Sequence, residues 1–472
     1  MCSFSCLFKP SMGTAMGNTK SGFHLPPKGY LRELRRETKI RFRDTPQRRS
    51  SVERTQKIDE PFKEGHRRGV TKKAIKEFII SNPEFLDDFV KTYVSQDRIR
   101  AWLKLTNTKP RLSDKLKQVN SNQSEEFATE IAERRFRQTK ALVLTRNHLF
   151  YPFRFRMEEF SSLIARPSTQ AEFPEMNSHL FPYTEIYNDD INRVFISMTM
   201  QLFGPHGFPL TELCYFLSSL KANYFNVEYH NYSHALSHAQ SMFWMLKKNP
   251  GVFTENEMKG LMIASIAHDV GHFGVNERYL REVGNGLERM YHNPILEHHN
   301  IQVCFLILAD INCNVFCDMS AEDYKMVLGC IRHAIRSTEV NRYKMQVQTM
   351  RQLLSSNLDF DDMEVKHAVI SLMMMACDLC AAWKRWPEHK NTVWSLYKEF
   401  FYQGDKEMLH GIDSPPQMMR MNAENIPYFQ VAYMENIVLP IFRLVSKVFP
   451  NCRSILKETI ENCNFWKSYE TS

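Results

Sequence analysis

The chain has 472 residues, 43% of them apolar and 24% charged, which is enough to bury the core of one large domain or of two smaller ones. Its 11 cysteines follow no spacing typical of a zinc finger or a secreted disulfide scaffold, and no stretch approaches the roughly 20 apolar residues that span a bilayer. We expect no signal peptide, a cytoplasmic location and reduced thiols. Nothing in the pattern predicts nucleic acid as a partner.

Residues 1–70 are basic and lack apolar periodicity. Eight arginines lie between Arg32 and Arg54, in a chain whose net charge is +8. Dense charge with low hydrophobicity is typical of disordered segments, so we predict a disordered basic tail. Cys2 and Cys6 support an alternative hypothesis of weak membrane association, because acyl chains beside a basic run would form a two-part anchor.

Residues 71–154 alternate apolar and charged positions at helical spacing. The stretch from Thr71 to Leu105 predicts two or three short amphipathic helices, broken at Asn82 and Pro83, and another is expected from Glu125 to about Arg146. We predict a helical extension here, which either covers the following domain or mediates a homodimer.

From residue 155 to about 465, apolar-periodic segments of helical length follow one another. Examples are DINRVFISMTMQLF, LTELCYFLSSLKANYF, EDYKMVLGCIRHAIRS and KHAVISLMMMACDLCAAWK. Period-two alternation bounded by tight turns, the signature of strands, is scarce in this region. We predict an all-α domain.

Polar groups lie at the end of, or within, two of the most apolar segments. His268 and Asp269 end the run LMIASIA, and Asp378 lies within SLMMMACDLCAAW. Buried charged groups are costly unless they are paired or bind a cation, so the three together suggest a shared metal ion.

YHNYSHALSHAQ adds three histidines at intervals of four, His230, His234 and His238, which would fall near one face if the segment were helical. We interpret His238 as structural.

Six ordered blocks carry a resemblance to a known family: YHNYSHA, HDVGHFGVN, LEHH, ACDL, EFFYQGD and IPYFQVAY. In this order they resemble the class I 3′,5′-cyclic-nucleotide phosphodiesterases, which belong to the HD-domain phosphohydrolase superfamily. EFFYQGD and ACDL are closest to the branch of cGMP-specific, photoreceptor and dual-specificity enzymes. The resemblance covers about residues 155–465 and implies a compact multi-helix catalytic domain that hydrolyses cAMP, cGMP or both to 5′-monophosphates.

The resemblance also implies a two-metal mechanism. It assigns four ligands to a tightly held Zn²⁺: His234, His268, Asp269 and Asp378. Asp269 would also reach a second ion, Mg²⁺ or Mn²⁺, and a hydroxide bridging both ions would attack phosphorus. His230 matches the general acid that protonates the leaving 3′ oxygen, while His272 and Glu297 match residues that orient ligands or metal-bound water.

Substrate recognition is implied in the last block. Gln430 matches the glutamine that hydrogen-bonds the purine edge, and its amide can pair with adenine or guanine. Tyr433 and Leu396 match the residues that clamp the purine, and Tyr229 is a further expected substrate contact.

Several positions depart from the family pattern, among them Val431 and Ala432 after the glutamine. Gly271 stands where a second aspartate is common, Tyr433 replaces a phenylalanine, and Glu339 replaces an aspartate. Residues 71–154 are also too few for the complete GAF domain that relatives carry.

Two alternative functions therefore stay open. One is an HD-type phosphohydrolase of other nucleotides, which leaves Gln430 without a role, and the other is a catalytically weak cyclic-nucleotide-binding protein, which Gly271 motivates.

Overall fold

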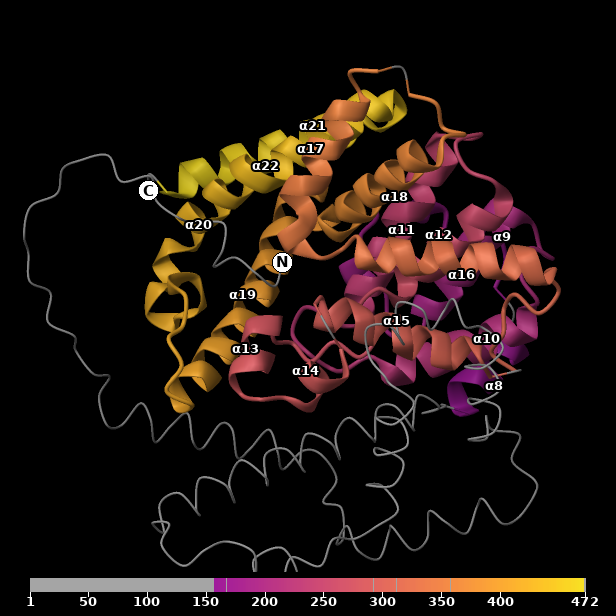
Figure 1. Cartoon of the computed structure of the whole chain (residues 1–472), viewed down its shortest axis with the longest axis horizontal. Coiled ribbons are helices and arrows are strands. Elements are labelled where there is room, and N and C mark those ends of the chain that lie inside the picture. Colours follow the sequence, from indigo (N-terminus) through magenta and orange to yellow (C-terminus); the bar gives the residue numbers. More distant parts are fainter. Residues whose placement is uncertain (1–156, 167, 292, 311, 357, 471–472) are drawn as a thin grey trace, which may run out of the picture. The chain divides into compact units, whose positions relative to one another are not determined.

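The computed structural model describes residues 157–166, 168–291, 293–310, 312–356 and 358–470. The all-α prediction is confirmed, since these residues form helices and turns and contain no strand (Figure 1). Within the same residues, no helix combines the length and the apolar character needed to cross a bilayer. The basic tail and the helical extension predicted for residues 1–154 lie outside the described residues, and the domain boundaries stay predictions.

The first half of the described chain contains α8 (Met157–Ala165), α9 (Ile191–Phe203), α10 (Leu210–Asn223), α11 (Tyr232–Lys248), α12 (Glu255–Ala267), α13 (Glu277–Glu282), α14 (Gly286–Met290) and α15 (Ile295–Leu308). The second half contains α16 (Ala321–Arg336), α17 (Tyr343–Leu353), α18 (Met363–Asp378), α19 (Trp386–Leu409), α20 (Ile426–Tyr433), α21 (Leu439–Val448) and α22 (Ser454–Glu470). A π-helical turn, Met434–Val438, joins α20 to α21.

The centre of the fold is α11, which is buried along most of its length. It packs against α9, α12 and α18, and α16 packs against α12 and α18 (Figure 1). Its buried polar side chains have partners, since Gln240 donates to the carbonyls of Met176 and Ser178, and Ser241 donates to that of Ser237. The interior position of α11 places its first turn, with the predicted metal ligand His234, inside the core.

Side-chain caps determine where the three ligand-bearing helices begin. Asn231 caps α11 by accepting hydrogen bonds from the backbone amides of Ser233 and His234. Thr254 begins α12 with a capping box, and Asp362 caps α18. Such caps satisfy amides that have no partner within the helix.

The cap at Asn231 corrects one expectation. His230 precedes the helix and does not share a helical face with His234 and His238, because the chain becomes helical only from Tyr232. The general-acid candidate therefore lies on the segment that enters α11.

Candidate active site

The four predicted metal ligands converge in the interior. His234 comes from the first turn of α11, His268 and Asp269 follow the last residue of α12, and Asp378 is the last residue of α18. All four are buried. Three helix ends thus contribute to one cluster, because α11 packs against both α12 and α18.

The distances between the ligand atoms fit one cation. Nε2 of His234 lies 3.2 Å from Nε2 of His268, 3.5 Å from Oδ2 of Asp269 and 3.3 Å from Oδ1 of Asp378. Nε2 of His268 lies 3.1 Å and 3.6 Å from the same two carboxylate oxygens. In a tetrahedral site with metal–ligand bonds of about 2.0–2.1 Å, neighbouring ligand atoms are about 3.3–3.4 Å apart. Five of the six pairs of ligand atoms have about this separation, and His234, His268 and Asp269 form a group whose ligand atoms all lie within 4.8 Å of one another. The donor set of imidazole nitrogens and carboxylate oxygens fits a metal site.

The charges in the cluster are those expected around a cation. Burial disfavours the charged forms of Asp269 and Asp378, yet the adjacent histidines hold the pKa of both carboxyl groups well below the ordinary value. Burial also opposes protonation of His268, but the two carboxylates outweigh it and raise its pKa to about 10. A proton on His268 balances the carboxylates when no cation does, so metal binding would release that proton.

Neighbouring groups orient the ligands. Nδ1 of His268 donates to the carbonyl of Ser265 at 3.0 Å, so Nε2 is the nitrogen that faces the cluster and whose lone pair would bind a metal once its proton is released. Nδ2 of Asn300 donates to the carbonyl of His268 at 2.6 Å. The hydroxyl of Tyr343 donates to Oδ2 of Asp378 at 2.7 Å, while Oδ1 faces the histidines.

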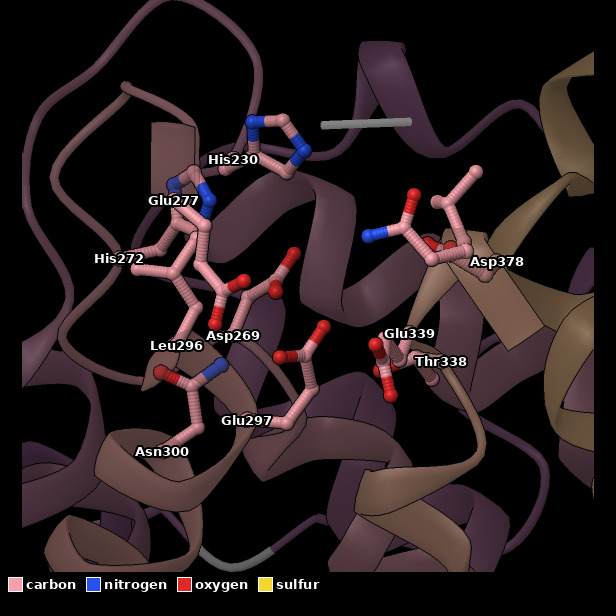
Figure 2. A pocket seen from close by; sticks show the side chains of 12 residues that line it. His230, Asp269, His272, Glu277, Leu296, Glu297, Asn300, Thr338, Glu339 and Asp378 are labelled. Carbon is pink, nitrogen blue, oxygen red and sulfur yellow. The ribbon is translucent and has the colours of Figure 1, made fainter. Parts of the chain in front are cut away.

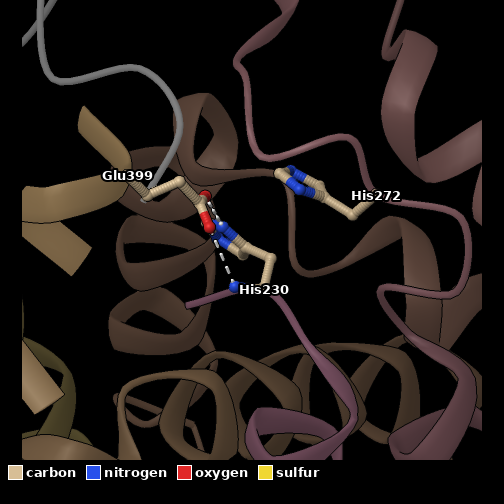
Figure 3. Close-up of side chains that lie close together, drawn as sticks. All are labelled: His230, His272 and Glu399. Atoms are coloured by element: carbon tan, nitrogen blue, oxygen red, sulfur yellow. Dashed lines mark hydrogen bonds and ion pairs between the residues drawn. The ribbon is translucent and has the colours of Figure 1, made fainter. Parts of the chain in front are cut away.

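A second buried group contains His230, His272 and Glu399 (Figure 3). One oxygen of Glu399 pairs with Nδ1 of His230, and the other accepts the backbone amides of Tyr229 and His230 at 2.9 Å and 3.2 Å. Burial opposes the charge on Glu399, but the histidines and these amides lower its pKa to about 2. The rings of His230 and His272 lie 4.1 Å apart between centroids. An ionised carboxylate therefore holds His230 by its Nδ1 side and stabilises its positive charge.

A pocket joins the two groups (Figure 2). His230 and His272 line it together with five acidic residues: Asp269, Glu277, Glu297, Glu339 and Asp378. In Figure 2 the carboxylates of Asp269 and Glu297 lie between the histidines and Asp378. So many carboxylates attract divalent cations and repel a phosphate group unless cations screen them.

The predicted purine contacts are buried but do not line this pocket. Gln430 and Tyr433 lie on α20, Leu396 lies on α19, and Tyr229 precedes α11. Nε2 of Gln430 donates to the hydroxyl of Tyr397 at 3.4 Å, a bond that orients the amide. The ring of Tyr229 lies 4.6 Å from that of His234 between centroids. The structure therefore places Tyr229 beside the metal cluster, and the purine-binding roles of all four stay predictions.

The departure at Gly271 has a steric reason. Its φ is +84°, in the left-handed region that favours glycine, and a Cβ atom there would lie 2.8 Å from Nε2 of His299. The ring of His299 occupies the space that an aspartate would need. The backbone conformation and the local packing therefore account for a glycine at position 271.

Two functional candidates escaped the sequence analysis, Glu399 and Tyr343. Glu399 lies within the block EFFYQGD and shares a buried helix face with Leu396 and Thr392, so an acid among apolar positions was a usable signal. Tyr343 begins α17 and gives no comparable signal, because its partner Asp378 is 35 residues further along the chain.

Comparisons with known proteins agree with the geometry. Residues 229–459 match the family described as 3′5′-cyclic nucleotide phosphodiesterase. The chain is 32% identical over 316 residues to a cGMP-specific 3′,5′-cyclic phosphodiesterase of Drosophila virilis, an alignment that covers 66% of this chain and 35% of that protein. For the protein of the same description in Drosophila melanogaster, the identity is 33% over 305 residues, with 63% of this chain and 27% of the relative covered. The chain thus spans about a third of these relatives or less.

Proposed function

Residues 229–459 form a class I 3′5′-cyclic nucleotide phosphodiesterase domain, and we propose on that basis that this chain hydrolyses 3′,5′-cyclic nucleotides to nucleoside 5′-monophosphates. The observation that carries the proposal is the buried cluster of imidazole and carboxylate ligand atoms beside a histidine that a buried carboxylate holds in place. The family match and the site geometry both support a metal-dependent hydrolase.

His234, His268, Asp269 and Asp378 would hold Zn²⁺, since two imidazole nitrogens and two carboxylate oxygens are ligands that zinc accepts. Asp269 would share a second ion, Mg²⁺ or Mn²⁺, on the side of the pocket that Glu297 and His272 line. When bound, such a pair of cations supplies a nucleophile from water at neutral pH and neutralises the charge of the phosphate.

The chain's own residues supply the proton. Glu399 occupies Nδ1 of His230, so Nε2 is the nitrogen that would deliver a proton to the 3′ oxygen as its bond to phosphorus breaks. The products are a free 3′ hydroxyl and a 5′-phosphate that has gained the oxygen of water. His230 then recovers a proton from solvent while Glu399 keeps the imidazolium stable.

The purine would bind to Gln430, whose amide offers both a donor and an acceptor. Stacking on Tyr433 opposite Leu396 would contribute on the order of 1–3 kcal/mol. The two relatives described above are cGMP-specific by name, which supports cGMP as a substrate, with cAMP as the alternative.

We retain three further proposals from the sequence. These are a cytoplasmic location, a homodimer, and weak membrane association through Cys2, Cys6 and the basic segment. Light scattering of the whole chain tests the dimer, and labelling of acylated cysteines in cells tests the anchor.

The function is tested with the purified full chain by combining metal analysis with hydrolysis assays on cAMP, cGMP and deoxynucleoside triphosphates. We expect bound zinc and hydrolysis of a cyclic nucleotide, and His230→Ala should retain the metal while losing most turnover. A protein that binds no metal, or that cleaves only deoxynucleoside triphosphates, would show the proposal to be wrong.

A further inference from the structure

Two buried tyrosines contact the two aspartates of the metal cluster. Tyr343 is the first residue of α17, and Tyr224 directly follows α10. Their side chains are 1% and 9% exposed, so water does not compete for their hydroxyl groups. Neither tyrosine belongs to the sequence blocks that predicted the site.

Tyr343 acts on the carboxylate of Asp378. Its hydroxyl donates to Oδ2 at 2.7 Å, and the other oxygen, Oδ1, lies 3.3 Å and 3.6 Å from the ligand nitrogens of His234 and His268. A carboxylate can present either oxygen by rotating about its terminal bond. The hydrogen bond to one oxygen therefore fixes the rotation of the carboxylate, so that its other oxygen faces the cluster.

Tyr224 acts on the backbone that carries Asp269. Its hydroxyl donates to the carbonyl of Ile266 at 2.9 Å and accepts the amide of Asp269 at 3.2 Å. These two backbone groups lie on either side of His268, at the end of α12. The last carbonyl groups of a helix have no amide partner within the helix, so a side-chain hydroxyl can bond to them. A single hydroxyl thus bridges the turn from which both ligands project.

We propose that Tyr343 and Tyr224 are positioning residues that preorganise Asp378 and Asp269 for metal binding. The inference rests on the proposed metal site and extends it to groups that touch no metal themselves. Removal of hydrogen-bond partners that orient metal ligands typically lowers metal affinity by about 10- to 100-fold. The larger loss is expected at Tyr343, since it bonds to the ligand carboxylate directly.

The test compares three Tyr→Phe variants of the full chain. Tyr343→Phe and Tyr224→Phe each remove one hydroxyl that contacts the cluster. The control is Tyr183→Phe, because the hydroxyl of Tyr183 forms an equally buried bond, 2.7 Å long, to Thr392, and neither residue is a predicted ligand or lines the pocket.

Each protein is stripped with a chelator and titrated with Zn²⁺ against a chromophoric competitor, and thermal unfolding of the stripped proteins is followed in parallel. We expect all three variants to lose similar stability, while only Tyr343→Phe and Tyr224→Phe lose zinc affinity, by about 10- to 100-fold. If Tyr343→Phe does not fold, Tyr224→Phe provides the same comparison.

Equal zinc affinity in the wild-type protein and both site variants would overturn the inference and leave the metal site intact. The same holds if the Tyr183→Phe control loses as much affinity as they do. A wild-type protein that binds no zinc would overturn the proposed metal site itself.

Discussion

Glu399→Gln isolates the contribution of one buried charge to catalysis. The amide keeps the size of the side chain and one oxygen, which can still accept the backbone amides of Tyr229 and His230. Its NH₂ group, however, would face Nδ1 of His230, where the carboxylate now lies. Two donors cannot pair, so the imidazole is expected to move its remaining proton to Nε2 and stay neutral, a form that is a poor acid.

The magnitude follows from the electrostatics of Glu399. Its pKa falls from 4.5 to about 2, despite a burial penalty in the opposite direction, and the charge of His230 is the largest cause of the decrease. The decrease corresponds to roughly 3 kcal/mol of favourable interaction, to which His230 contributes most, followed by His272 and the amide of Tyr229. Removing it should lower kcat/KM by roughly 100- to 1,000-fold at neutral pH, within the range that general acid catalysis contributes.

The assay is a pH profile of cyclic-nucleotide hydrolysis together with metal analysis. The alkaline limb of kcat/KM reports the loss of the proton from the general acid, so a less stable imidazolium should move that limb to lower pH. The matched control is Glu407→Gln, a buried glutamate on the same helix that pairs with Gln403 and Ser414. If Glu399→Gln keeps its metal and shows an unmoved alkaline limb with a rate within a few-fold of wild type, then Glu399 does not support His230 and the reasoning fails.

Three other predictions concern the metal, the backbone and acid stability. Asp378→Asn should lose the tightly held zinc, and elemental analysis showing an unchanged content would remove Asp378 from the ligand set. Gly271→Ala should destabilise the fold by about 2–4 kcal/mol in urea titrations, because φ is positive at this position and the added Cβ atom would contact His299. Gly284 also has a positive φ but lies in open space, so Gly284→Ala should cost only about 1 kcal/mol. Equal losses in the two variants would argue against the contact with His299. Burial lowers the pKa of His389 from 6.5 to about 4, and its ring accepts from Trp466 and donates to Ala381, so below pH 6.5 the unfolded chain binds more protons. The free energy of unfolding should therefore decrease from pH 6.5 to pH 4, by up to about 3 kcal/mol from this group. His389→Gln should make the free energy of unfolding depend less steeply on pH in this range. An equal dependence on pH in both proteins would contradict the assignment.

Much of the site could be predicted from the sequence because its signals are local. Charged or imidazole groups stand next to long apolar runs at two places: His268 and Asp269 after LMIASIA, and Asp378 within SLMMMACDLCAAW. Burying such groups is costly without a partner, and this signal can be read from each short segment alone. The structure brings all four predicted ligands together, and the all-α architecture follows the apolar periodicity from residue 157 onward. Local spacing nevertheless misplaced His230, which lies before the helix and not on its face.

The sequence by itself determined which segments become helices and which polar groups must find a counter-charge, since periodicity and side-chain chemistry act over a few residues. Only the tertiary structure decided which residues these polar groups pair with. Glu399 reaches His230 across 169 positions of chain, and Tyr343 reaches Asp378 across 35. His234 and His238 lie one helical turn apart in α11, yet only His234 has a ring nitrogen close to the carboxylates of Asp269 and Asp378. The direction in which each side chain points depends on how α11, α12, α18 and α19 pack, and many distant contacts together determine that packing.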